Sequence, residues 1–125
     1  MKVYKIGRLT NGVVCAVYDQ ESEVDGVLEA IREGTFNFLY MLPHILRHSP
    51  DGFEFGYRGS GPSDLSRSIL IDYFKDVEEK ANNYYRFFKE AFIVTLDGDG
   101  PHFINEIEIR TWLEYLGCNK SKEIV

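Results

Sequence analysis

Residues 48–65 read HSPDGFEFGYRGSGPSDL, a stretch in which glycine, proline and aromatic residues gather. Gly59 and Gly61 let the backbone turn sharply or approach another group closely. Pro62 suits the first turn of a helix, where its missing N–H group would have no partner anyway. We therefore expect a corner, in which a short strand over 52–57 leads into a helix that carries Pro62 in its first turn.

The start of this helix could also bind an anion. Ser60 or Gly61 would be the N-cap, and the free N–H groups and positive dipole of a helix N-terminus attract negative charge. Arg58 and Arg67 could add bidentate contacts to a phosphate. A plain corner with Arg58 in solvent explains the same residues, and both interpretations stay open. The candidate ligand-binding residues are His48, Arg58, Gly59, Ser60, Gly61 and Arg67.

His48 and Ser49 place a base beside a hydroxyl, and histidine titrates near neutral pH. Adjacency in sequence does not make a catalytic triad, which is a relation in three dimensions. A β-turn over 49–52, with Pro50 second and Gly52 fourth, is the simpler interpretation, and His48 then bonds nearby backbone. The chain contains no P-loop, no dinucleotide-binding glycine fingerprint and no G-x-S-x-G nucleophile elbow.

Ahead of the corner, the pattern predicts a hairpin and a further strand. KVYKIGRL (2–9) and VVCAVY (13–18) flank Asn11-Gly12, which signals a tight hairpin turn. Residues 35–50 begin with aromatic residues in alternation, at Phe36, Phe38 and Tyr40. We expect a short strand there and then a single turn, because Pro43 disfavours a continuous helix.

Between the hairpin and this further strand, the apolar residues of SEVDGVLEAIREG (22–34) have helical spacing. Ser22 with Asp25 resembles a capping box, and Gly34 fits the position after a helix end. Asp25-Gly26 could instead form a second hairpin turn. The expected buried face is Val24, Val27, Leu28 and Ile31.

Three helices are expected after the corner. The first has an apolar face at Leu65, Ile69, Leu70, Tyr73 and Phe74. Asp76 with Glu79 predicts the cap of the second, whose stripe is Val77, Ala81, Tyr84 and Phe88. Asn105 with Glu108 predicts the cap of the last, which Gly117 would end. Its stripe is Ile109, Trp112, Leu113 and Leu116. Between the second and third helices we expect a strand over 91–96, a turn over 97–100 and a return strand over 101–104.

Composition bounds the class of protein. The chain has 125 residues, 44% hydrophobic and 14% aromatic, which suffices for one core. No apolar run approaches the ~20 residues of a membrane helix, and the N-terminus lacks the apolar segment of a secretory signal. We therefore expect a cytoplasmic, single-domain α+β protein over residues 1–118, with a flexible tail over 119–125. Its small antiparallel or mixed sheet would pack against three to four helices.

Neither cysteines nor histidines predict a metal site. Cys15 and Cys118 match no CxxC spacing, so we expect two unpaired thiols rather than a disulfide. The histidines, His44, His48 and His102, lack the spacing of zinc ligands. DGDG (97–100) predicts a turn rather than a cation site. Asp64 and Asp72 lie on one face of the helix after the corner, and Asp64 is explained without a metal because a carboxylate in the first turn interacts favourably with the helix dipole. We expect no metal and no cofactor.

The net charge is −6, with 20 acidic and 14 basic residues, which argues against nucleic acid as a partner. A local basic patch stays open as an alternative, from the sequence cluster of Arg47, His48, Arg58 and Arg67. Acidic residues within 21–33 and 76–79 could instead form a surface that binds a host protein. Tyr85 and Phe87 lie off the apolar stripe of their helix, so one of them should be exposed. An exposed aromatic residue there could support a homodimer.

The corner resembles a family of small uncharacterised domains from bacteria, archaea and their viruses. The pattern is His-Ser-Pro-x-Gly-Phe-x-aromatic-Gly-Tyr-x-Gly-Ser-Gly-Pro, which this chain carries from His48 to Pro62. The likeness continues at Phe87-Phe88-Lys89 and at Ile109, Trp112 and Leu113. Arg58 stands where that family usually has a small residue, and 22–46 is longer than its usual connection. The resemblance implies a compact domain, often encoded on phages or mobile elements, and transfers no activity.

Three functions follow as hypotheses. The first is a non-enzymatic binding domain, an accessory protein of a phage or mobile element, whose 48–62 loop binds an anionic ligand or a protein partner. The second is a phosphoester hydrolase or nuclease with His48 as base and Arg58 or Arg67 on the phosphate. The third is an acidic inhibitor of a host protein. We expect binding rather than catalysis, because the sequence offers no evident nucleophile or metal cage. We expect no membrane contact, because no apolar run is long enough to span a bilayer.

Overall fold

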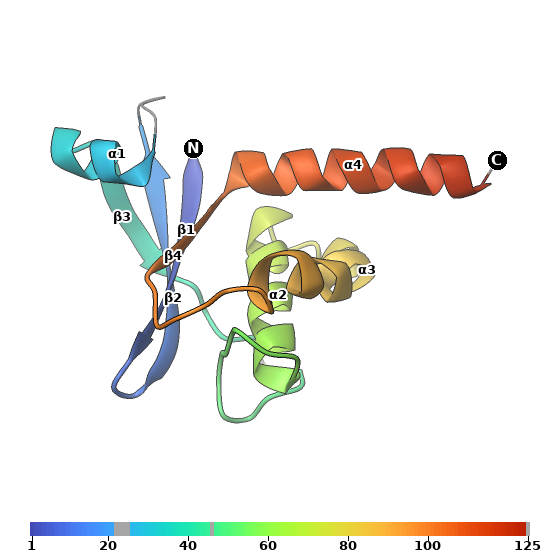
Figure 1. Cartoon of the computed structure of the whole chain (residues 1–125), viewed down its shortest axis with the longest axis horizontal. Coiled ribbons are helices and arrows are strands. Elements are labelled where there is room, and N and C mark those ends of the chain that lie inside the picture. The colour runs from blue at the N-terminus through green and yellow to red at the C-terminus, as the bar shows by residue number, and fades with distance from the viewer. Residues whose placement is uncertain (22–25, 46, 125) are drawn as a thin grey trace.

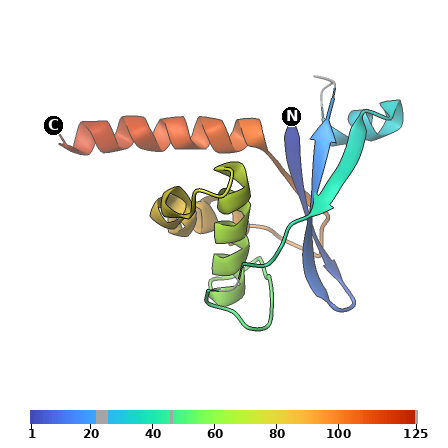
Figure 2. The same ribbon diagram turned by 180° about the vertical axis from the view of Figure 1, so that it is seen from behind.

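The structure is a computed structural model that describes residues 1–21, 26–45 and 47–124, with residues 118–124 described by their backbone alone. It confirms the α+β class, since a four-stranded antiparallel sheet and four α-helices form one small domain. Helices α2, α3 and α4 lie on one side of the strands, and α1 lies beyond β3 (Figure 1, Figure 2). The elements are β1 (Lys2–Leu9), β2 (Gly12–Gln20), α1 (Val27–Glu33), β3 (Phe36–Met41), α2 (Ser60–Tyr73), α3 (Glu78–Phe88), η1 (Lys89–Ile93), β4 (His102–Asn105) and α4 (Glu106–Ile124).

The predicted hairpin is confirmed. β1 and β2 pair from Lys2↔Asp19 to Leu9↔Gly12, so the chain turns at Thr10-Asn11. The predicted return strand is β4, and it pairs with the other edge of β1. The strand order is therefore β3-β2-β1-β4, with β1 and β2 in the middle of the sheet.

The prediction of a strand over 91–96 is wrong. α3 continues into one turn of π-helix, η1, over Lys89–Ile93. This path places the rings of Phe88 and Phe92 4.7 Å apart, and each lies 5.6 Å from Trp112 of α4. The β-branched run in this segment favours a strand locally, but the aromatic packing stabilises the helical path.

The prediction of a strand over 52–57 is also wrong. This segment forms a single β-bridge, between Val13 and Phe53. Phe53 and Phe55 are buried, whereas Tyr57, expected on the same face, is 51% exposed. Gly56 has a φ of 85°, and a Cβ there would lie 3.0 Å from the carbonyl oxygen of Leu96. The chain therefore turns at Gly56 instead of continuing as a strand.

α1 has the predicted end and a different buried face. Gly34 closes the helix at a φ of 73°, in the left-handed conformation. Leu28 and Ile31 were expected to be buried, but they are 72% and 49% exposed. Ala30 is the buried residue, because this short helix packs beside β3. The cap expected at Ser22 and Asp25, the face residue Val24 and the alternative turn at Asp25-Gly26 lie wholly or partly outside the described residues.

β3 forms where predicted, at the edge of the sheet. We expected a single turn after β3, but the described residues 42–45 and 47–50 contain no helical turn. Tyr18 pairs with Phe38 and Val17 with Tyr40, so Leu39 is the extra residue of a bulge. Because of this bulge, Tyr40 reaches α2, where its hydroxyl donates to Asp72.

Two helix caps differ from expectation. Gly59, rather than Ser60 or Gly61, is the N-cap of α2, and no side chain caps it. Val77 is the N-cap of α3, again without a side-chain bond, so the cap expected from Asp76 and Glu79 is wrong. The N–H of Asp76 instead donates to the carbonyl oxygen of Ile71 at 2.8 Å, which closes the end of α2.

α4 begins as predicted and ends later. The N–H of Glu108 donates to Oδ1 of Asn105 at 2.8 Å, and the N–H of Asn105 donates to Oε1 of Glu108 at 3.4 Å, which is a capping box. Gly117 does not end the helix, which runs to Ile124. Ile109 is fully buried, and Trp112 packs against the same core.

Candidate functional site

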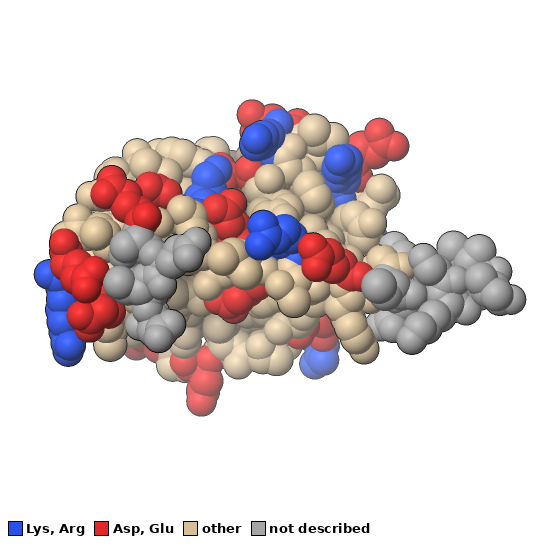
Figure 3. Space-filling model, turned by 90° about the horizontal axis from the view of Figure 1, so that it is seen from above, with Lys and Arg blue, Asp and Glu red and all other residues tan. Residues whose placement is uncertain are grey.

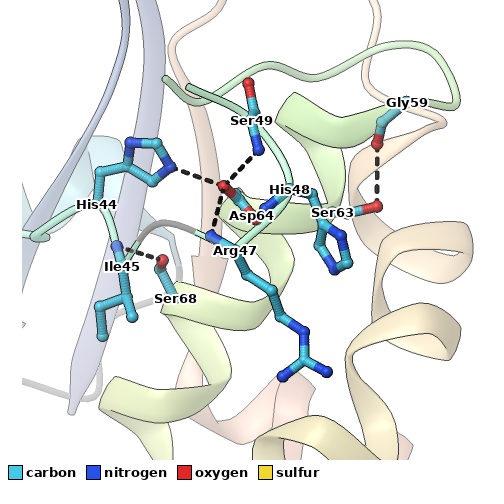
Figure 4. A network of polar contacts seen from close by, with 9 residues as sticks. All are labelled: His44, Ile45, Arg47, His48, Ser49, Gly59, Ser63, Asp64 and Ser68. Carbon is cyan, nitrogen blue, oxygen red and sulfur yellow. Dashed lines mark hydrogen bonds and ion pairs between the residues drawn. The ribbon is translucent and has the colours of Figure 1, made fainter. Parts of the chain in front are cut away.

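Asp64 connects the corner to the loop before it. This residue lies in α2 and is fully buried. Its carboxylate accepts hydrogen bonds from the backbone N–H groups of Arg47 at 3.3 Å, His48 at 2.9 Å and Ser49 at 3.0 Å. It also lies 2.8 Å from Nε2 of His44 (Figure 4). A carboxylate offers about four acceptor positions, so these contacts occupy it and hold the 44–49 loop against α2.

The surroundings of Asp64 favour its ionised form. Burial alone raises the pKa of this carboxyl, but the hydrogen bonds from His44 and from three backbone N–H groups lower it, and the net shift is downward. A second contact ties the same loop to α2, because the N–H of Ile45 donates to Oγ of Ser68 at 3.2 Å. The sequence suggested only a helix-dipole role for Asp64, since its partners lie 15 to 20 positions away.

His48 lies against α3. Its Nε2 is 3.0 Å from the hydroxyl oxygen of Tyr85, whose ring is buried. Ser49 is itself buried, with its N–H on Asp64. Pro50 and Asp51 form the predicted turn. The imidazole of His48 therefore meets a tyrosine hydroxyl rather than the backbone contact expected from sequence.

The two arginines pair with different parts of the α3 and η1 segment. Nε of Arg58 lies 3.1 Å from both carboxylate oxygens of Glu90. Arg67 is buried, and its guanidinium donates to Asn82 at 2.8 Å and to Glu78 at 3.3 Å. Glu78 and Glu90 are about 18 Å apart along a helix, at 1.5 Å per residue. Arg58 and Arg67 are thus not brought together on one ligand position.

Gly59 and Gly61 permit close packing at the corner. A Cβ on Gly61 would lie 2.7 Å from Cβ of Glu54, and one on Gly59 would lie 2.8 Å from the ring of Tyr57. Residues 54–57 therefore cover the start of α2. Ser60 itself is exposed.

Residues 7–115 match the model for a family of unknown function, DUF6166. The chain belongs to this family. The matched range includes the whole corner and the Asp64 contacts, and it confirms the resemblance to a family of small uncharacterised domains. No curated protein and no solved structure matches the chain.

This DUF6166 chain has a second carboxylate cluster that sequence reasoning missed. The carboxylate of Asp72 in α2 accepts hydrogen bonds from the hydroxyl of Tyr4 at 2.6 Å, from Nζ of Lys2 at 3.1 Å and from the hydroxyl of Tyr40. Burial raises the pKa of Tyr4, and its bond to Asp72 raises that pKa further. The cluster joins β1 and β3 to α2. No local pattern signals it, because its members lie far apart in sequence.

Exposed side chains beside the corner define what we call the corner face: Tyr57, Arg58, Phe87 and Glu90. Tyr57 is 51% and Phe87 53% exposed, whereas Tyr85 is buried, so one of the two predicted aromatic residues is indeed exposed. Glu90 follows Phe87 by three residues in a helical segment and binds Arg58, which adjoins Tyr57. The Arg58–Glu90 ion pair therefore joins the two segments that carry the exposed rings.

Other features of the DUF6166 chain bear on its chemistry. Across the described residues there is no group of three His, Cys, Asp or Glu that could hold a metal ion. In the same part of the chain, no helix has the length and apolar character needed to cross a membrane. On the face seen in Figure 3, acidic side chains gather at the left end, and acidic and basic side chains are mixed over the rest.

Proposed function

We propose that the chain is a cytoplasmic, non-enzymatic binding module that docks a protein partner on its corner face. The proposal rests on two exposed aromatic rings: Tyr57 precedes Arg58 in sequence, and Phe87 lies three residues before Glu90, which binds Arg58. Tyrosine and arginine are enriched among the residues that dominate binding energy at protein interfaces. The close approach of Gly59 to the Tyr57 ring and of Gly61 to Glu54 holds residues 54–57 against α2, which reduces the conformational entropy that Tyr57 loses on binding.

Arg58 and Arg67 both have acceptors within the protein, which favours a protein partner over a small anion on the 48–62 loop. A phosphate at Arg58 would have to displace the carboxylate of Glu90, and Arg67 is buried against α3. At the start of α2, the close approach of Glu54 to Gly61 leaves little room for a ligand. A protein partner needs only the exposed rings and the outer edge of the Arg58–Glu90 pair.

The alternatives receive less support from the same residues. His48 as the base of a phosphoester hydrolase would first have to leave the hydroxyl of Tyr85, and both Tyr85 and the adjacent Ser49 are buried. An acidic inhibitor needs an extended negative surface, whereas in Figure 3 the acidic side chains gather only at the left end and both signs are mixed over the rest of the face. The suggestion of a phage or mobile-element accessory protein follows from the family resemblance alone.

A capture experiment with matched variants tests the proposal. Tyr57→Ser with Phe87→Ser removes both rings, while Leu28→Ser with Tyr115→Ser removes two apolar side chains that are at least as exposed elsewhere. Quantitative mass spectrometry of proteins captured from the native host should show one or more partners retained by the wild type and the control, and lost by the first variant. Equal capture by both variants contradicts the proposal. Turnover of a nucleotide or phosphodiester that His48→Ala abolishes would replace it with the hydrolase.

A further inference from the structure

A pocket of about 390 Å³ lies over the central strands, on the face opposite the buried side chains of Tyr4 and Ile6. The register pairs Lys5 with Ala16 and Gly7 with Val14, so these four residues lie side by side on that face. Met41 and Pro101 bound the pocket from β3 and from the segment before β4. We call this the sheet slot: Lys5, Gly7, Val14, Ala16, Met41 and Pro101.

Small residues create the slot. Gly7 has no side chain, and a Cβ placed there would have no atom within 4 Å, so the space above it is open. Antiparallel sheets usually turn polar side chains towards solvent on an uncovered face. Here the floor and both walls are apolar, and the charged lining residues are Lys5, Arg8 and Asp99. A volume of this size falls within the range of small-molecule sites, about 300–1,000 Å³.

Charge selects the kind of ligand. Arg8, at the other end of the slot, is paired with Glu54 at 2.7 Å and with Asp99 at 3.3 Å. Lys5 makes no ion pair with any described residue, and its Nζ lies 5.8 Å from the ring centroid of Tyr18. A negative group is therefore complementary to the Lys5 end. The carboxylate of Asp99 disfavours it at the other end.

We propose that the sheet slot binds a small amphipathic carboxylate, with its apolar chain over Gly7 and Ala16 and its carboxylate on Nζ of Lys5. This site is independent of the corner face. The larger groove at Trp112, about 570 Å³, offers no such selectivity, because its described lining holds Glu108 and no lysine or arginine.

The test uses decanoate, decan-1-ol and decylamine as matched probes. In amide chemical-shift titrations, decanoate should perturb Gly7, Val14 and Ala16 and bind more tightly than decylamine. Lys5→Met should weaken decanoate binding about tenfold while leaving decan-1-ol unchanged, since only a charged hydrogen bond is lost. Gly7→Val should fill the slot and abolish binding of both. This variant should fold, because the site has room for the side chain and valine favours strands.

Each contrary outcome overturns the proposal. Decylamine binding as tightly as decanoate would refute the role of Lys5. Trp112 is the sole tryptophan and packs on Phe88 and Phe92. A change in its fluorescence that survives Gly7→Val would place the probe in the other groove. A wild-type dimer that Gly7→Val dissociates, without decanoate binding, would show that a second copy covers the slot. Loss of the capture partner in the corner-face variant leaves this proposal untouched.

Discussion

Oδ2 of Asp64 lies 2.8 Å from Nε2 of His44, although 20 positions separate the two residues. The same carboxylate holds three successive backbone N–H groups of the 44–49 loop. One buried acid therefore decides where the chain enters the corner. The glycines then allow residues 54–57 to lie against the start of α2.

Asp64→Asn should destabilise the protein strongly. The side-chain NH2 group would face either the backbone N–H of His48 or those of Arg47 and Ser49, depending on which way the amide turns. At least one buried donor then loses its acceptor, which costs about 1–3 kcal/mol of unfolding free energy. Urea denaturation measures the loss. Asp97→Asn, at an exposed turn position, is the control and should change the unfolding free energy by less than about 0.5 kcal/mol.

The contribution of Asp64 should depend on pH in a defined direction. Its folded-state pKa lies below the ordinary value of 3.8, so the stabilisation is fully present above that value. It is lost as the pH falls through the folded-state pKa. Unfolding free energies between pH 7 and pH 2 should therefore converge for wild type and Asp64→Asn at acid pH. A gap that stays constant over this range would contradict the assignment of an ionised Asp64.

Two identical glycine substitutions should have opposite effects. Gly61→Ala places a Cβ 2.7 Å from Cβ of Glu54, and the resulting overlap should cost about 1–3 kcal/mol. Gly117→Ala, inside α4 with no atom within 4 Å, should stabilise by about 0.5–1 kcal/mol. Thermal unfolding of both variants gives the comparison. A neutral Gly61→Ala would mean that the corner does not need the close approach.

Tyr4→Phe should weaken the contact between β1 and α2. The hydroxyl of Tyr4 donates to Asp72 at 2.6 Å from a buried ring, and its removal should cost about 1–2 kcal/mol. Tyr115→Phe removes a hydroxyl from an exposed ring and should be neutral. A double-mutant cycle of Tyr4→Phe with Asp72→Asn isolates the pair. Additive losses would show that the two side chains do not act together.

Signals contained in a few neighbouring residues predicted the structure well. Asn11-Gly12 marks the hairpin, the Asn105 and Glu108 pair marks the start of α4, and the glycines before Pro62 mark the corner. In each case the stabilising contact lies within a short stretch of chain. Such contacts can be read from spacing alone.

Contacts between distant segments decided the rest. The 91–96 segment follows a helical path because Phe92 meets Trp112, which no local pattern reveals. Asp64 and Asp72 have several partners each, all on other elements. In the candidate site, Arg58 and Arg67 looked like one cluster in sequence, but their acceptors lie at opposite ends of a helical segment.

The proposed function requires that the corner face contacts a protein partner. Site-specific photocrosslinking in the native host detects this contact, with Tyr57→p-benzoylphenylalanine compared with the same change at Leu28, which is also exposed. We expect a discrete adduct with another protein from position 57, absent from position 28. No adduct from position 57, or the same adducts from both positions, would contradict it.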